Sequence, residues 1–406
     1  MADRYFAETE EQLDQLGAEG LLGEDHHIDL KRELGNGPKA NKELARDLAS
    51  FAIDGGALYI GVAEGEAGDR PSLHPIELHG LPERIDQVAR STISPPLAVH
   101  PRVVPSEHAV GRGYLVVRVP PSPDAPHMVD GRYWGRGAVT KEQLSDAQVR
   151  EIFERRNRAR GEAAELLEQV VARDPTPPEL RDQAHLFLLA HPLFAPSDLL
   201  LRAFGGASGE QWLGNNVLHG EPAQFPSRWA PDLVPDASNV SRRALGWALH
   251  SYEMGPDRSL RSAREDRPPA EIGLLDLELD ENGTLRLFCG RASDMTRSTR
   301  VVFEALIAGL TRRLVITASV VAQEGGYFGP WSLGLALSNL RGAVSWFTSE
   351  NLFGHGVAYS ESDYRMTTEA SFEDLRARPD DVVERLFGRL NRALNGGNFD
   401  PTSANL

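Results

Sequence analysis

Three acidic residues and one lysine in the first 64 positions have the types and spacing of a hydrolytic site. The segment at 27–33, HIDLKRE, alternates apolar and polar residues, which predicts a half-buried strand with Asp29 and Lys31 on the same face. Glu24 precedes this strand, and Glu64 follows a later apolar segment. Gathered carboxylates stay ionised when a cation lies among them, and oxygen ligands favour Mg²⁺ or Mn²⁺. We therefore predict that Glu24, Asp29 and Glu64 are catalytic metal ligands and that Lys31 is catalytic beside them.

A metal held by carboxylates next to a lysine suits phosphodiester hydrolysis. The metal makes a bound water more acidic, and the metal and the lysine both stabilise negative charge on the phosphate in the transition state. The same spacing has a simpler interpretation, because Asp-x-Lys on an exposed strand is often a solvated ion pair worth ~0–1 kcal/mol. Both interpretations stay open on the spacing alone.

The elements that must position these residues form a predicted α+β unit over residues 1–157. The apolar run at 57–62 predicts a buried strand, so Glu64 lies near Asp29 if the two strands are neighbours. Asp130-Gly131 suits the type I′ turn of a hairpin at 127–134, and Ser145-x-x-Gln148 matches a capping box that opens a helix through 156. Further helices are predicted at 5–16, 41–53 and 81–93, and further strands at 99–104 and 114–119.

Residues 158–406 are expected to form a second, mostly helical domain that contains one β-hairpin at 272–289. Within it we predict a buried helix followed by a buried strand at 301–322 and a helix at 331–340. The charged, proline-containing stretch 257–269 is the best candidate for a linker, which places a possible sub-boundary near 257–270. This region carries no motif that indicates chemistry, and we assign it to sensing or dimerisation.

Three blocks of sequence, in order, resemble the Schlafen AlbA_2 domain over residues 20–157. They read GEDHHIDLKREL, NKELARDLASFAIDGGALYIGV and SPDAPHMVDGRYWGRG. The resemblance implies that fold and a metal-dependent endoribonuclease acting on transfer RNA and similar structured RNA. Glu24 and Asp29 match two of the family's three carboxylates by motif position. Where the pattern usually has Asp after "GV", this chain has Ala63 and then Glu64, and Ile53 replaces a usual Asn.

The resemblance also has implications for the oligomeric state and the biological role. Vertebrate relatives pair two such lobes in one chain, and one lobe is found here, so a homodimer is expected. Bacterial members suggest a role in antiphage defence and often carry the label "ATP-binding". That label finds little support in the residues, because the chain lacks both G-x-x-x-x-G-K-[ST] and G-x-G-x-x-G. The alternative is a non-catalytic nucleic-acid-binding or ATP-binding regulatory protein.

Basic residues are few, but the lysines are concentrated. The net charge is −16, which argues against a protein that coats DNA through phosphate neutralisation, although a basic groove can exist on an acidic molecule. All four lysines lie in the first 150 residues. We predict that RNA, tRNA-like or single-stranded, binds basic side chains of two segments, together with aromatic side chains that stack on bases. The predicted nucleic-acid contacts are Lys39, Lys42, Arg46, Arg132, Tyr133, Trp134, Arg136 and Lys141.

Several classes of protein are excluded or disfavoured. Cys289 is the only cysteine, so an intrachain disulfide or a cysteine-rich zinc module cannot form. The acidic N-terminal segment lacks the apolar region of a secretory signal, and the longest apolar stretch, at 314–322, is much shorter than the ~20 residues of a membrane span. We therefore expect a soluble, cytoplasmic protein without a membrane partner.

Overall fold

The computed structural model divides the chain into two compact units, residues 1–158 and 159–406, which are described separately below. The described residues are 7–65, 70–122, 124–195, 197–200, 209–218, 220, 239–261, 271–296, 299–349 and 357–395. One helix, α4 (Asp146–Ala172), continues across the boundary between the units.

A five-stranded sheet forms the centre of the N-terminal unit. β1 pairs in parallel with β2, and β7 pairs antiparallel with β2, β5 and β6. The strands of this sheet are β1 (Ile28–Lys31), β2 (Gly56–Ile60), β5 (Ile76–Glu77), β6 (His100–Pro105) and β7 (Arg112–Val119). Two smaller sheets contain β3 (Val62–Ala63) with β4 (Ser72–Leu73), and β8 (Met128–Val129), β9 (Arg132–Arg136) and β10 (Lys141–Gln143).

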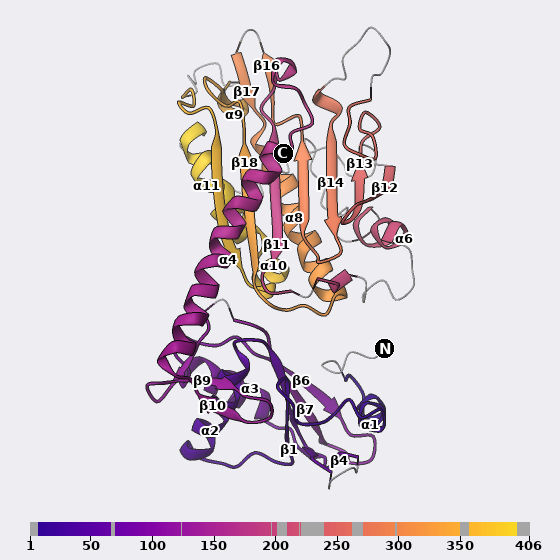
Figure 1. Cartoon of the computed structure of the whole chain (residues 1–406), viewed down its shortest axis with the longest axis vertical. Helices are drawn as coiled ribbons and strands as arrows, with labels where there is room; N and C mark the ends of the chain where they lie inside the picture. The colour runs from indigo at the N-terminus through magenta and orange to yellow at the C-terminus, as the bar shows by residue number, and fades with distance from the viewer. Residues whose placement is uncertain are drawn as a thin grey trace. The chain divides into compact units, whose positions relative to one another are not determined.

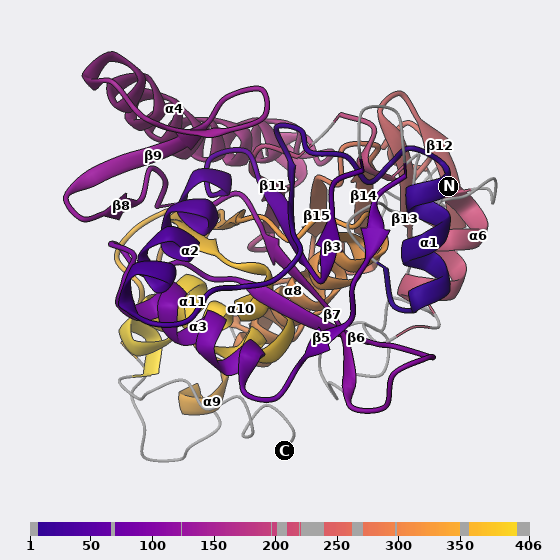
Figure 2. The same cartoon turned by 90° about the horizontal axis from the view of Figure 1, so that it is seen from below.

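Helices cover both faces of this sheet. Figure 2 shows α2 (Pro38–Phe51) and α3 (Leu81–Ser91) on one side of the strands and α1 (Glu10–Ala18) on the other. All five residues of β2 are buried, with Leu58 and Ile60 in the core under α2 and α3, and Ala57 and Tyr59 in the core under α1. Burial on both faces explains why this strand reads as a continuous apolar run in the sequence.

Two short-range predictions in this unit are confirmed. Asp130 and Gly131 have φ values of 52° and 72°, which is the left-handed pair that a type I′ turn requires between β8 and β9. The Ser145 hydroxyl accepts from the Gln148 backbone N–H, and the Gln148 side chain accepts from the Ser145 backbone N–H, so the capping box is formed. The helix that it opens continues well beyond residue 156, to Ala172.

The second unit is built on a seven-stranded antiparallel sheet, which corrects the expectation of a mostly helical C-terminal region. Its strand order is β12-β13-β14-β15-β11-β18-β20. The bounds are β11 (Leu186–Pro192), β12 (Asn239–Arg243), β13 (Gly246–His250), β14 (Leu275–Asp280), β15 (Leu285–Cys289), β18 (Trp331–Leu337) and β20 (Tyr364–Ala370). The predicted hairpin at 272–289 is present as β14 and β15.

Helices lie on both faces of this sheet as well. In Figure 1, α4 crosses the front of the sheet and α8 (Glu304–Glu324) lies behind it. α8, α10 (Phe372–Ala377) and α11 (Pro379–Asn395) pack into the larger core, and the C-terminal part of α4 packs into a smaller one. The remaining elements are η1 (Pro178–Leu180), α6 (Gly209–Leu213), η2 (Gly214–Leu218), η4 (Glu271–Gly273), β16 (Ser293–Thr296), β17 (Thr299–Val302), β19 (Val344–Ser345) and α9 (Trp346–Ser349).

Burial of β18 on both faces explains why the sequence pattern predicted a helix there. Every residue of β18 is buried, so the run at 331–337 lacks the alternation of a half-buried strand and is compatible with a helix by its pattern alone. The apolar segment at 301–322 is the end of β17 followed by one helix, α8, rather than a helix and a strand. The stretch at 257–269 lies within the connection between β13 and β14, which pair directly, and residues 262–269 of it lie outside the described residues.

The helix α8 is, within the described part of the chain, the one helix long and apolar enough to cross a membrane. In the structure 89% of its apolar window is buried. Burial of this extent is expected of a helix in the core of a protein.

Candidate functional site

The side chains of β1 alternate between the two faces of the sheet, as the sequence pattern predicts. Ile28 and Leu30 belong to the core under α1, while Asp29 and Lys31 lie on the α2 side of the sheet. The parallel register with β2 places Asp29 opposite Leu58, so the charged pair lies beside the apolar core that α2 covers. A polar pair at this position needs internal partners, because burial of an unpaired charge is costly.

Asp29 is 6% exposed and has two cationic neighbours. The Lys31 Nζ lies 2.8 Å from Asp29 Oδ2, and the Arg136 Nη2 lies 3.5 Å from Asp29 Oδ1. The Lys31 side chain is 32% exposed, so its ammonium group is held by Asp29 and still accessible from solvent. This ion pair therefore offers a positive charge to an anionic ligand without burying that charge.

Arg136, one of the predicted nucleic-acid contacts, is buried and bound to backbone carbonyl oxygens in this structure. Its side chain is 2% exposed. The guanidinium donates to the carbonyl oxygens of Asp25 (3.0 Å) and Ile28 (2.8 Å) and lies over the Phe51 ring, 4.4 Å from its centroid. Arg136 therefore fixes the start of β1 and the position of Asp29 from inside the fold.

Asp47, on α2, is a member of this site that the sequence analysis missed. Its carboxylate lies 2.5 Å from the Lys141 Nζ and 4.0 Å from the Lys31 Nζ, so it joins the two lysines. Glu43, one turn earlier, also contacts Lys141, at 2.6 Å. The available signal was an acidic residue within the apolar run of α2, where only a partnered carboxylate is expected.

The pKa values of Asp47 and Lys141 reflect competition between burial, which disfavours charge, and the attraction of nearby opposite charges, which favours it. Burial raises the pKa of Asp47 above its ordinary value, although Lys31 and Lys141 oppose the shift. Burial alone would lower the pKa of Lys141, but Asp47 and Glu43 outweigh it and the net direction is upward. Lys141 therefore stays charged, while the Asp47 carboxylate is ionised at some cost.

Glu24 and Glu64 lie near this cluster without completing a metal centre. Glu24 accepts a hydrogen bond from the Leu30 backbone N–H at 3.3 Å, and burial, followed by the charges of Asp29 and Glu64, raises its pKa. Glu64 is exposed. Among the residues that the structure describes, no three acidic, histidine or cysteine side chains are grouped closely enough to hold a metal. The three carboxylates thus share an electrostatic environment, but in this conformation they are not gathered.

The comparisons with known proteins identify this region. Residues 24–145 match the family model of the Schlafen AlbA_2 domain, and they include Glu24, Asp29, Lys31, Asp47 and Glu64. The N-terminal unit contains a Schlafen AlbA_2 domain. The match covers under a third of the chain, and the C-terminal unit lies outside it. The search of curated proteins found no match.

Two solved structures are similar to parts of the chain. One is the N-terminal domain of a RecG-related protein from Nitrosomonas europaea, with 22% identity and a TM-score of 0.25, covering 35% of this chain and 92% of that one. The other is the DIP2311 protein from Corynebacterium diphtheriae, with 20% identity and a TM-score of 0.22, covering 46% of this chain and 32% of that one.

The predicted nucleic-acid contacts on α2 of the AlbA_2 domain are largely paired within the domain. Lys42 and Arg46 both contact Asp130, at 3.0 and 3.4 Å, and Arg46 also lies over the Trp134 ring. Lys39 is exposed, with no ion-pair partner among the described residues. Asp130 thus neutralises part of the positive charge that the sequence places on this face.

The contacts predicted on β9 and β10 have mixed surroundings. Arg132 is exposed and donates to the Gln143 side chain at 3.1 Å, so it remains accessible. Tyr133 packs edge-on against Phe153, and the Trp134 indole N–H donates to the Val129 carbonyl oxygen at 3.3 Å. Both rings are half-buried, so each has one part in the fold and one part in solvent.

Proposed function

We propose that the AlbA_2 domain binds RNA, tRNA-like or single-stranded, and hydrolyses its phosphodiester bonds with a divalent cation, Mg²⁺ or Mn²⁺. The Schlafen AlbA_2 assignment is consistent with a nucleic-acid-related function. The observation that carries the proposal is the Asp29–Lys31 pair at 2.8 Å, with an accessible ammonium group and the electrostatically coupled Glu24 beside it. We place this activity in the cytoplasm and, from the family resemblance, in antiphage defence.

Lys31 is the residue that would contact the scissile phosphate. Its ammonium group can offset the negative charge that develops on the phosphate oxygens, and Asp29 fixes its direction. Asp47 lies 4.0 Å from the Lys31 Nζ and holds Lys141 at 2.5 Å, so it links the two ammonium groups. We assign Asp47 and Lys141 to positioning, since they act through Lys31.

Glu24 and Asp29 would hold the cation, with Glu64 as a third ligand. All three supply oxygen, the donor that Mg²⁺ and Mn²⁺ prefer, and the upward pKa shift of Glu24 comes from burial and then from neighbouring negative charge that a cation relieves. Because the carboxylates are not gathered in this conformation, the exposed Glu64 side chain would have to turn towards Glu24. When bound, the cation supplies charge neutralisation and a more acidic water.

A cleavage assay on the purified full chain tests the proposal. Transfer RNA, single-stranded RNA and single-stranded DNA are incubated with Mn²⁺, Mg²⁺ or EDTA. We expect metal-dependent cleavage of RNA, lowered by about 100-fold or more in Lys31→Ala and Asp29→Asn, the size of loss typical for a group that stabilises transition-state charge. Glu83→Gln, which alters a carboxylate on α3, is the matched control and should cleave normally.

Metal binding has a separate readout. Mn²⁺ alone should raise the unfolding temperature of the wild-type chain, and this shift should be lost in Glu24→Gln and retained in Glu83→Gln. An unchanged unfolding temperature in millimolar Mn²⁺, together with cleavage that survives EDTA, would rule out the metal site while leaving RNA binding open.

A second candidate, binding without catalysis, is favoured by the neutralisation of Asp29. Lys31 and Arg136 already compensate this carboxylate, which weakens it as a metal ligand. The result expected of a binding module is an RNA mobility shift without cleavage, unaffected by Asp29→Asn. Stabilisation by ATP with no response to RNA would instead favour a nucleotide-binding regulator.

A further inference from the structure

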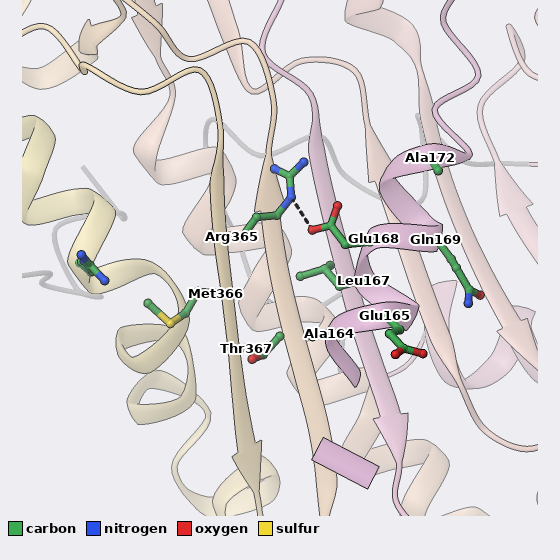
Figure 3. Close-up of a pocket in the computed structure, with 10 residues that line it drawn as sticks. Ala164, Glu165, Leu167, Glu168, Gln169, Ala172, Arg365, Met366 and Thr367 are labelled. Carbon is green, nitrogen blue, oxygen red and sulfur yellow. Dashed lines mark hydrogen bonds and ion pairs between the residues drawn. The ribbon is translucent and has the colours of Figure 1, made fainter. Parts of the chain in front are cut away.

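The strand β20 forms one edge of the sheet in the second unit. It pairs with β18 on one side, and no described strand pairs with its other side. A pocket of about 820 Å³ runs beside it, lined by α4 residues including Leu167 and Glu168, by Arg365, Met366 and Thr367 of β20, and by Arg389 of α11. Figure 3 shows these β20 residues next to α4, with Arg365 and Glu168 directed towards each other.

The hydrogen-bond register shows which backbone groups of β20 face this edge. The Ser338 N–H donates to the His185 carbonyl oxygen, so even-numbered residues of β18 direct their backbone groups to β11 and odd-numbered ones to β20. In the β18–β20 register, those odd-numbered residues lie opposite even-numbered residues of β20. The backbone N–H and C=O groups of Arg365, Thr367 and Glu369 therefore point away from the sheet, along its edge.

These outward groups form a template for another strand. Within the described residues, the backbone N–H and C=O of Thr367, whose side chain is exposed, have no hydrogen-bond partner. The Glu369 carbonyl oxygen accepts from the Arg385 guanidinium at 3.0 Å and from the Thr368 hydroxyl at 3.5 Å, so an added strand would replace the longer of these two hydrogen bonds. An edge of this kind favours addition of an antiparallel strand.

We propose that the strand added here is β20 of a second copy of this chain, related by a two-fold axis through Thr367. In that antiparallel register Arg365 lies opposite Glu369 of the second copy, and the reverse pair lies on the other side of the axis. Opposite charges on directly facing residues stabilise such pairs, and Thr367 faces Thr367 of the second copy at the centre. The segment is thus complementary to itself, as a two-fold interface requires.

The pairing would replace contacts that Arg365 already makes. Arg365 contacts Glu168 at 3.0 Å, and the Glu168 side chain is 62% exposed, so this ion pair contributes little. Its guanidinium also donates to the carbonyl oxygens of Leu337 (2.9 Å) and Tyr364 (3.0 Å), and it would have to turn from these to reach Glu369 of the second copy. The Met366 side chain packs against the core behind the sheet. The side chains of Arg365 and Thr367, on either side of it in the strand, therefore lie on the opposite face of the sheet. The second copy would therefore extend the sheet while the core under α8 and α11 stays intact.

Thr367→Pro is the variant that separates self-pairing from the fold of the unit. Proline removes an N–H that points outward, so pairing with β18 is kept, and a proline at an edge position blocks strand addition. Thr367→Val keeps the N–H and is the matched control. Sedimentation of the wild type and Thr367→Val should give twice the 44.5 kDa chain mass, and Thr367→Pro should give one chain mass with an unchanged circular dichroism spectrum.

Two results would overturn the proposal. One is a wild-type chain that stays at one chain mass up to about 100 µM, above the range of weak but specific interfaces. The other is a folded Thr367→Pro chain that still has twice the chain mass, because the dimer would then use another surface.

Charge reversal gives an independent test of the register. Arg365→Glu places two carboxylates opposite each other at each cross-strand pair, and Glu369→Arg places two guanidinium groups there, so each variant alone should lose dimer. Mixing the two variants places opposite charges at both cross-strand pairs of the mixed dimer, so mixed dimer should form where neither variant pairs with itself. If both single variants dimerise as well as the wild type, the proposed register is wrong.

Discussion

Both units place carboxylates and cations on one face of a sheet, but the cations differ. In the second unit, Arg243 binds both Asp276 oxygens, at 2.7 and 2.9 Å, and also contacts Glu278 at 2.5 Å. Arg286 lies 2.6 Å from Asp280. In the AlbA_2 domain, lysines make the closest ion pairs with Asp29 and Asp47. Arginine presents a planar fork that binds carboxylates in two places at once, whereas lysine is a compact charge that can turn to another partner.

The difference indicates which cluster is structural. The carboxylates of the second-unit network are nearly closed to solvent. Burial opposes their ionisation, but Arg258, Arg173 and Arg243 outweigh it at Glu278 and hold its pKa below the ordinary value. Asp280, at the end of the network, is the exception, since burial raises its pKa. In the AlbA_2 domain burial raises the pKa of Asp47 and of Glu24, and Lys31 stays accessible. A site with incompletely compensated carboxylates and an accessible cation is suited to binding a ligand.

The largest expected effect is on the arginine network. Arg243→Ala leaves Asp276 and Glu278 buried without their main partner, which should lower the free energy of unfolding by about 3–5 kcal/mol. Arg242→Ala, one residue earlier, removes an exposed pair with Glu281 and should cost about 1 kcal/mol or less. Urea denaturation followed by tryptophan fluorescence measures both, since five of the six tryptophans lie in the second unit. Equal losses in the two variants would contradict the structural role of the network.

A buried carboxylate that has no cationic partner among the described residues gives a further test of this comparison. Glu304, at the start of α8, is 3% exposed, and burial raises its pKa to about 7. Its folded pKa exceeds the unfolded value of 4.5, so the folded state holds the proton more tightly and stability falls as pH rises from 4.5 through about 7. Glu304→Gln should remove this loss and be more stable than the wild type by up to about 3 kcal/mol at pH 8, with little difference at pH 4. The same stability difference at both pH values would disprove this account.

A smaller difference in stability is expected between variants of one carboxylate from each cluster. Glu278→Gln should destabilise the chain by about 2 kcal/mol at pH 7, because its ionised form is favoured by the fold. Asp47→Asn should change stability by less than about 1 kcal/mol, because ionisation of Asp47 is disfavoured by burial. Thermal unfolding and the RNA assay are measured on the same samples. A large loss of stability in Asp47→Asn would make the lysine cluster structural, like the arginine network.

The features that the sequence predicted correctly are those set by neighbouring residues. Alternation in β1 separated Ile28 and Leu30 from Asp29 and Lys31. Asp130-Gly131 and the Ser145–Gln148 capping box each depend on a backbone conformation within four residues. The concentration of lysines in the first 150 residues also pointed to the region where Lys31 and Lys141 meet at Asp47.

By itself the sequence determined the α+β unit at the N-terminus, its resemblance to the AlbA_2 domain and the residue types of the candidate site. Only the tertiary structure decided that Asp47 joins Lys141 across 94 positions and that Arg136 is buried beside Asp29 across 107. It also decided that the apolar run at 331–337 is a strand and that the apolar run at 304–322 is a single helix. Side-chain pairs of this kind form only when the whole unit closes, and burial on both faces removes the alternation by which strands are recognised.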